Sequence, residues 1–204
     1  MNVNHVPRLY VVSSPSGGGK STIVRRVKDI LPGLAYSVSS TTRAPRSGEV
    51  NGCDYCFLSR EEFIDKIARG DLLEHAEVHG YFYGTDRHVI QRFLDSGLDV
   101  LLDLDVQGGL QLKASRSDAV LIFVAPPNLV VLEQRLRARA TDADEVIALR
   151  LRNAISEMKA IPHYDYLIVN DDLEQATIAM ASIIRAERRR ITHLAPEALA
   201  LYQE

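Results

Sequence analysis

The sequence contains little cysteine and no long apolar segment. Its two cysteines, Cys53 and Cys56, are too few for the disulfide framework of a secreted protein of this length. No stretch approaches the roughly 18 consecutive apolar residues of a transmembrane helix, and the first residues lack the cationic and apolar regions of a secretory signal. We therefore expect a cytoplasmic protein with no membrane partner.

An excess of charge of one sign is also lacking. The chain has 24 Lys and Arg residues against 27 Asp and Glu, a net charge of −3. This balance excludes the broad basic surface of a dedicated nucleic-acid-binding protein, so any bound anion must be held by a local site. With 46% hydrophobic and 25% charged residues, the composition is that of an ordinary globular chain. Its 204 residues favour one domain that carries insertions.

Short apolar runs alternate with segments of helical periodicity. Four such runs predict buried strands, each followed by a helical stretch: residues 9–12, 100–104, 119–124 and 166–169. This order predicts an α/β fold with a parallel sheet flanked by helices. Two stretches break the pattern. Residues 34–97, which include a helix predicted to begin at Ser59, are long enough for a subdomain, and the arginine-rich residues 135–152 resemble a hinged flap.

A glycine-rich segment joins the first predicted strand to the first predicted helix. It consists of Ser14, Pro15, Ser16, Gly17, Gly18, Gly19, Lys20 and Ser21. Glycines allow backbone N–H groups to converge on phosphate oxygens, and the helix N-terminus adds partial positive charge. Lys20 is placed to reach terminal phosphates and Ser21 to ligate Mg²⁺. Ser14 stands where this loop pattern usually has its first glycine, so the opening turn must accept a Cβ.

Two acidic residues close the apolar run at residues 100–104. Asp103 and Asp105 are two positions apart, which in a continuing strand places both side chains on one face. The carboxyl ends of parallel strands face the ligand crevice of an open α/β sheet. We expect one or both carboxylates to meet Mg²⁺, directly or through water, or a substrate donor.

The motifs around these residues resemble those of guanylate kinases along nearly the whole chain. The resemblance is carried by SVSSTTRAPRSGEVNGCDYCF, LLEHAEVHGYFYGT, DLDVQG and HYDYLIVNDDL, in this order. It implies a P-loop core with a small GMP-binding subdomain and a helical lid. We expect a single domain with its core in residues 1–33, 98–134 and 153–204, the subdomain in 34–97 and the lid in 135–152.

The resemblance also implies the substrates and the residues that hold them. The substrates are Mg·ATP and GMP, and ADP and GDP are the products; dGMP and homo-oligomerisation stay open. Guanine recognition falls on Ser39, Glu74 and Asp105, and the GMP phosphate on Arg43, Arg46, Tyr55 and Tyr83, with Gly84 and Thr85 beside them. The side chains suit these roles, because a carboxylate such as Glu74 accepts the two N–H donors of guanine, whereas adenine offers an acceptor at N1.

Four further positions are assigned by the resemblance. The lid residues Arg135, Arg139 and Arg150 match arginines aimed at the transferring phosphoryl group, which with Lys20 are the catalytic residues. Asn170 falls near the base of ATP. Ala140 replaces a residue that is usually glycine in the family, which predicts a stiffer lid.

Three alternatives remain open beside this interpretation. Cys53, Cys56, His75 and His79 resemble a zinc ligand set, but the 18 residues between Cys56 and His75 exceed the usual gap of about 12 to 15. The same core also serves kinases for another nucleoside monophosphate or a phosphorylated sugar. A binding module that grips a phosphopeptide without turnover is the third, and it is disfavoured by the intact Gly19, Lys20 and Ser21.

Overall fold

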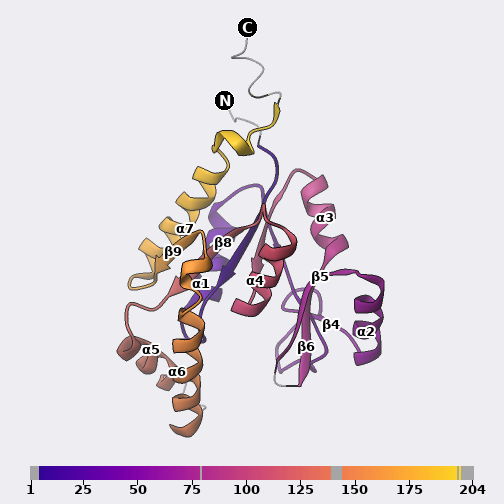
Figure 1. The fold of residues 1–204 in the computed structure, drawn as a ribbon. Helices are drawn as coiled ribbons and strands as arrows, with labels where there is room; N and C mark the ends of the chain where they lie inside the picture. The colour runs from indigo at the N-terminus through magenta and orange to yellow at the C-terminus, as the bar shows by residue number, and fades with distance from the viewer. Residues whose placement is uncertain (1–4, 79, 139–143, 197, 199–204) are drawn as a thin grey trace.

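The computed structural model describes residues 5–78, 80–138, 144–196 and 198. Figure 1 shows a central sheet with helices on both faces, a smaller sheet to one side and a helical arm on the other. The first half of this described chain contains β1 (Leu9–Ser13), α1 (Lys20–Ile30), β2 (Leu34–Ser37), β3 (Ser40–Thr41), β4 (Cys56–Phe57), α2 (Arg60–Arg69), β5 (Leu72–Val78), β6 (Tyr81–Asp86) and α3 (Arg87–Asp95). The second half contains β7 (Asp99–Asp103), α4 (Val106–Ser115), β8 (Val120–Ala125), α5 (Leu129–Arg137), α6 (Asp144–Met158), β9 (Tyr166–Val169) and α7 (Leu173–Glu187), with short 3₁₀ helices at Ile161–His163 and Ile191–His193.

The central sheet has five parallel strands in the order β2-β7-β1-β8-β9. Alternate residues of β1 face opposite layers, as strand geometry requires. Tyr10 and Val12 pack in a cluster with α1 and α7, while Leu9 and Val11 pack in a cluster with α3 and α4. Both faces are therefore covered, which explains why the strands are continuous apolar runs. The predicted α/β fold is confirmed.

The smaller sheet is built from the stretch that interrupts the pattern. Its four strands have the order β4-β3-β6-β5, and β5 and β6 form an antiparallel pair. Helix α2 lies against this sheet, with Phe63 fully buried and its ring stacked on Phe82 at a centroid distance of 5.4 Å. The helix begins where predicted: Ser59 and Glu62 form a capping box, in which each side chain accepts the other's backbone N–H.

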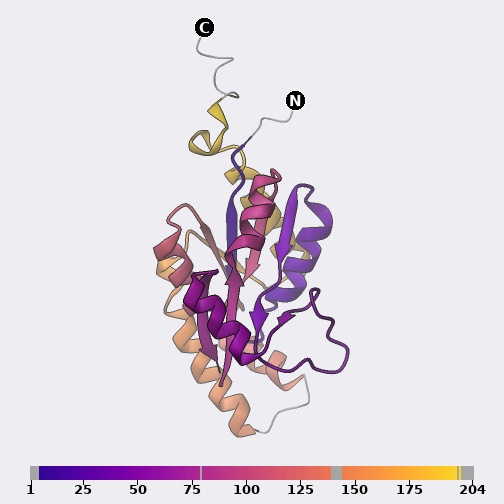
Figure 2. The same cartoon turned by 90° about the vertical axis from the view of Figure 1, so that its right-hand side faces the viewer.

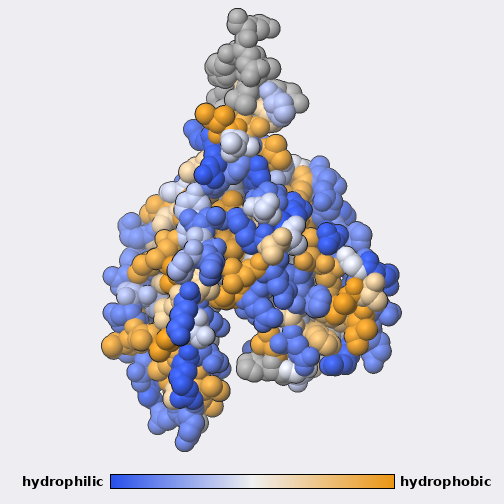
Figure 3. Space-filling model, viewed as in Figure 1, coloured by the Kyte–Doolittle hydropathy of each residue, from blue (hydrophilic) through white to orange (hydrophobic). Residues whose placement is uncertain are grey.

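The helical arm is formed by α5 and α6. A small apolar cluster joins them, with Leu132 and Leu136 on α5 packed near Ile147 and Ala154 on α6. In Figure 2 the arm and the small sheet extend below the central sheet. Figure 3 shows a hollow between the arm, at lower left, and the small sheet, at lower right.

Some expectations fall outside the described residues. The structure does not describe residues 139–143, which belong to the predicted lid, or residues 197 and 199–204 at the C-terminal end. In the described part, α6 continues to Met158, beyond the predicted end of the lid at residue 152. None of the described helices combines the length and apolarity needed to cross a membrane.

Candidate active site

The glycine-rich segment forms the turn between β1 and α1. Gly17 and Gly19 have φ angles of 90° and 91°, a region that side chains with a Cβ rarely adopt. Gly19 is the N-cap of α1, and no side chain caps the helix. The first N–H groups of α1 therefore have no side-chain acceptor and are oriented to receive an anion.

Ser14 fits this turn although it replaces a usual glycine. Its hydroxyl donates to the carbonyl oxygen of Pro15 over 3.1 Å, and the N–H of Gly18 donates to the same oxygen over 2.9 Å. A Cβ on Gly18 would lie 2.0 Å from the Ser14 hydroxyl oxygen. Ser14 thus fills the space that Gly18 leaves, and the turn accepts the Cβ as expected.

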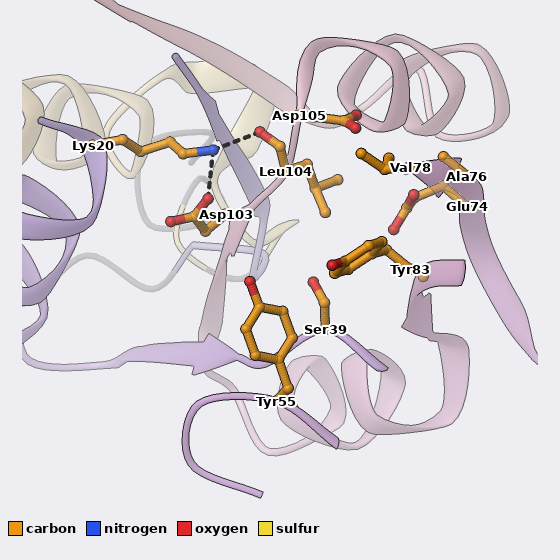
Figure 4. Close-up of a pocket in the computed structure, with 11 residues that line it drawn as sticks. Lys20, Ser39, Tyr55, Glu74, Ala76, Val78, Tyr83, Asp103, Leu104 and Asp105 are labelled. Carbon is orange, nitrogen blue, oxygen red and sulfur yellow. Dashed lines mark hydrogen bonds and ion pairs between the residues drawn. The ribbon is translucent and has the colours of Figure 1, made fainter. Parts of the chain in front are cut away.

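Lys20 connects this loop to the acidic end of β7. Its ammonium lies 2.5 Å from Oδ1 of Asp103 and donates to the carbonyl oxygen of Leu104 over 2.8 Å (Figure 4). Both Lys20 and Asp103 are partly exposed to the crevice. The ion pair places a cation and a hard oxygen ligand beside the glycine-rich loop.

The prediction that Asp103 and Asp105 share one strand face was wrong. Strand β7 ends at Asp103, and Asp105 is the N-cap of α4, whose carboxylate accepts the N–H of Gly108 over 2.7 Å. The chain leaves the strand geometry at Leu104, so the period of two no longer applies. In Figure 4 Asp103 points toward Lys20, whereas Asp105 points toward Glu74 on the small sheet.

A cavity of about 270 Å³ lies between the two sheets. It brings together most of the residues predicted for guanine and its nucleotide: Lys20, Ser39, Tyr55, Glu74, Tyr83, Gly84, Asp103 and Asp105. In Figure 4, Glu74 and Tyr83 lie on one side of the cavity and Lys20 and Asp103 on the other. A ligand in this cavity therefore contacts the small sheet with one end and the phosphate loop with the other.

Glu74 is the buried acid of this cavity, with 7% of its surface exposed. Thr85, its partner on β6, donates its hydroxyl to Glu74 Oε1 over 2.6 Å. Burial raises the pKa of Glu74 from 4.5 to about 7, and nearby Asp105 adds to the rise, while the Thr85 hydrogen bond opposes it. A carboxylate desolvated in this way is expected to bind a ligand that supplies hydrogen-bond donors.

Arg43 and Arg46 lie on the loop between β3 and β4. The Arg43 guanidinium is 5.3 Å from the ring centre of Tyr55 and donates to Glu49 over 2.8 Å. Glu49 also accepts the backbone N–H of Arg46 over 2.7 Å, and the Arg43 hydrogen bond holds the pKa of Glu49 below its usual range. The Arg46 side chain is exposed. Glu49 thus accepts hydrogen bonds from the Arg43 guanidinium and the Arg46 backbone N–H, which are donors that could also bind a phosphate dianion.

The residues predicted for the lid and the base of ATP are only partly described. Arg135 and Asn170 lie together, with the Arg135 guanidinium donating to the backbone carbonyl oxygen of Asn170 over 2.9 Å. Arg150 is half-buried on α6. Arg139 and Ala140 lie outside the described residues, so the expectation of a stiffer lid stays a prediction.

Two acidic residues of this region were missed by the sequence interpretation. Glu157 on α6 is half-buried, and burial together with Asp105 raises its pKa. Glu157 follows Arg150 by seven residues, which is about two helical turns and places both side chains on one face of the helix. This spacing could have indicated that Glu157 lies on the same face as the predicted lid arginine. Glu49 follows Arg46 by three residues in a loop, where no periodicity indicates a contact.

The alternative of a zinc site finds no support among the described residues. Cys53 is exposed and Cys56 partly buried, and both are free thiols. Across the ranges the structure describes, no group of three or more His, Cys, Asp or Glu side chains is arranged to hold a metal ion. His79 is not among those residues.

The geometry defines the class of protein. A parallel sheet with a phosphate loop at its carboxyl edge, a separate small sheet with a buried acid, and an arginine-bearing helical arm are together the architecture of a P-loop nucleoside monophosphate kinase. The guanylate kinase family model matches residues 6–187. The chain therefore belongs to the guanylate kinase family.

Similar proteins agree with this assignment. The chain is 50% identical over 178 residues to the guanylate kinase of Rubrobacter xylanophilus, covering 87% of this chain and 93% of that one. It is 47% identical over 186 residues to the guanylate kinase of Escherichia coli K12, covering 90% of each. The crystal structure of guanylate kinase from Anaplasma phagocytophilum superposes with a TM-score of 0.78 at 34% identity, covering 99% of this chain and 98% of that one.

Proposed function

We propose that the protein transfers the γ-phosphoryl group of ATP to GMP, giving ADP and GDP. The observation that carries the choice of GMP is Glu74, a buried carboxylate that faces the cavity and, among the described residues, accepts a side-chain hydrogen bond from Thr85 alone. Guanine supplies two N–H donors on one edge, whereas adenine places an acceptor against the carboxylate. Leaving such a buried acceptor unpaired is costly, so the pocket favours guanine over adenine.

The phosphate of GMP is assigned to Arg43, Arg46, Tyr55 and Tyr83. Arg43 is held against the ring of Tyr55, a residue that lines the cavity. A phosphate dianion is a stronger acceptor than a single carboxylate, so it is expected to displace Glu49 from Arg43.

Catalysis in this scheme is positioning plus charge stabilisation. The N-terminus of α1 and the loop N–H groups bind the phosphates of ATP, and Lys20 and the lid arginines stabilise the charge that develops during transfer. Lys20 must leave Asp103 to do so. No side chain serves as a covalent nucleophile. Closure of the lid excludes water, which prevents hydrolysis of ATP.

Ser21 and Asp103 are the residues proposed to hold Mg²⁺, directly or through water. They fit a hard cation, since Ser21 is exposed in the first turn of α1 and Asp103 presents a partly exposed carboxylate beside the loop. Bound there with ATP, the ion would supply positive charge to the phosphate oxygens.

A panel of acceptors with Mg·ATP, read as ADP release, tests the proposal. GMP is expected to be the preferred acceptor, dGMP shows whether the 2′-hydroxyl matters, and AMP is expected to be inactive. Lys20→Met should lower kcat by roughly 10²-fold or more, while Lys28→Met, an exposed lysine on the same helix, should leave it unchanged. ATP binding without ADP release in the presence of GMP would instead identify a binding module.

A further inference from the structure

Asn170 occupies a buried position at the carboxyl edge of the central sheet. It directly follows β9, and its backbone N–H donates to the carbonyl oxygen of Ala125 at the end of β8 over 2.8 Å. Only 4% of its surface is exposed. The residue is thus fixed by the sheet itself, and a side chain fixed in this way is able to act as a rigid support.

The side chain of Asn170 contacts the phosphate loop. Its Nδ2 donates to the carbonyl oxygen of Gly18 over 2.8 Å, a buried hydrogen bond between residues 152 positions apart. A Cβ on Gly19 would lie only 2.1 Å from the same nitrogen. The amide therefore fills the space beside Gly19 and contacts the Gly18–Gly19 peptide unit from one side.

This contact sets the direction of a loop N–H group. The carbonyl of Gly18 and the N–H of Gly19 belong to one planar trans peptide, so they point in opposite directions. With the carbonyl directed at Asn170, the N–H of Gly19 is directed away from it. If the peptide rotated, the loop would present a carbonyl oxygen where a phosphate requires a donor.

The same residue also contacts the base of the lid. The backbone carbonyl oxygen of Asn170 accepts a hydrogen bond from the Arg135 guanidinium on α5 over 2.9 Å. Helix α5 touches the loop as well, since a Cβ on Gly17 would lie 3.0 Å from Leu132 and 3.1 Å from Leu136. The loop, Asn170 and α5 are therefore one packed unit.

We propose that Asn170 is a positioning residue of the phosphate site. Its side-chain amide holds the Gly18–Gly19 peptide so that N–H groups face the phosphates of ATP. This role rests on the proposed ATP site. It differs from the contact with the ATP base that the family resemblance implies, because it concerns the binding of the phosphates and does not depend on the base.

Binding of two ligands separates the two roles. Isothermal titration with Mg·ATP and with Mg·tripolyphosphate, which has no base, is compared in the wild type, Asn170→Asp and Asn170→Ala. Asn170→Asp keeps the shape and an acceptor oxygen but loses the donor to Gly18. Both ligands are expected to weaken by the same factor, roughly tenfold for Asp, because a buried acceptor loses its partner. Gln175→Glu, an amide-to-carboxylate change at an exposed site, is the matched control and should change neither affinity.

The folding of each variant and its binding of GMP are measured in the same samples. GMP affinity should match the wild type in the Asn170 variants, which a general structural defect would not allow, and thermal unfolding shows that each variant is folded at the assay temperature although the lost buried hydrogen bond lowers its Tm. If Asn170→Asp is unfolded, Asn170→Ala decides the result. A variant that weakens ATP but binds tripolyphosphate as the wild type does would overturn the proposal. Loss of ATP binding in Lys20→Met together with unchanged Asn170 variants would overturn it while the proposed function stands.

Discussion

The hydroxyl of Thr85 donates to Oε1 of Glu74 over 2.6 Å, and this hydrogen bond opposes the rise in the pKa of Glu74 that burial causes. Glu74 lies on β5 and Thr85 on the neighbouring strand β6, where the two residues are paired. Burial prevails, so the pKa of Glu74 rises to about 7. The acid assigned to guanine therefore titrates within the physiological range, which has measurable consequences.

The affinity for GMP should fall as the pH is lowered through 7. Only the ionised Glu74 accepts both N–H groups of guanine, and its pKa of about 7 means that half of the free enzyme is protonated at that pH. We expect the KM for GMP to rise from pH 8 to pH 6 with no matching rise for ATP. The GMP phosphate itself titrates at about pH 6, so Glu74→Gln is the control that isolates the contribution of Glu74. Parallel profiles in the two proteins would contradict the assignment.

Replacing Thr85 by valine should move this profile to higher pH. The Thr85 hydroxyl stabilises the charged form of Glu74, so its loss raises the pKa of the carboxyl further. A hydrogen bond to a charged group contributes about 1.5 kcal/mol, which corresponds to a shift of about one pH unit. The measurement is the KM for GMP from pH 6 to pH 9. Thr85→Ser keeps the hydroxyl and should retain the wild-type profile; a serine variant shifted as far as valine would exclude the hydrogen bond as the cause.

Glu74→Gln should also make the protein more stable above neutral pH. The pKa of Glu74 is raised from 4.5 to about 7 on folding, so its contribution to stability is lost as the pH rises through this window. The cost is about 3 kcal/mol at pH 8 and negligible at pH 4, where both states are mostly protonated. A neutral glutamine avoids this cost while GMP selectivity is lost. Urea unfolding at pH 8 and pH 4 checks the prediction, and an equal difference at both pH values would refute it.

Features with a local signal were predictable, and those made by distant residues were not. The capping box of Ser59 and Glu62 and the buried strands follow from residues close in sequence. Asp105 was assigned to a strand face because nothing in DLD marks the point where β7 ends and the cap of α4 begins. The contact of Asn170 with Gly18 spans 152 positions and depends on how β9 is placed in the sheet, so the sequence pattern contains no sign of it.

Asp99 provides a prediction about stability alone. It is fully buried at the start of β7, the end of the sheet opposite the site, where it accepts the backbone N–H of Arg8 and the Arg188 guanidinium, each over 2.7 Å, and lies 3.1 Å from His5. Asp99→Ala leaves Arg188 without this carboxylate, and breaking a buried pair costs about 3–5 kcal/mol.

Asp118→Ala, at a partly exposed pair with Arg116, is the control and should cost about 0–1 kcal/mol. Urea unfolding measures both losses, and kcat at 25 °C should be unchanged in the folded fraction. If the two variants proved equally stable, Asp99 would not be the anchor that joins the end of α7 to the sheet.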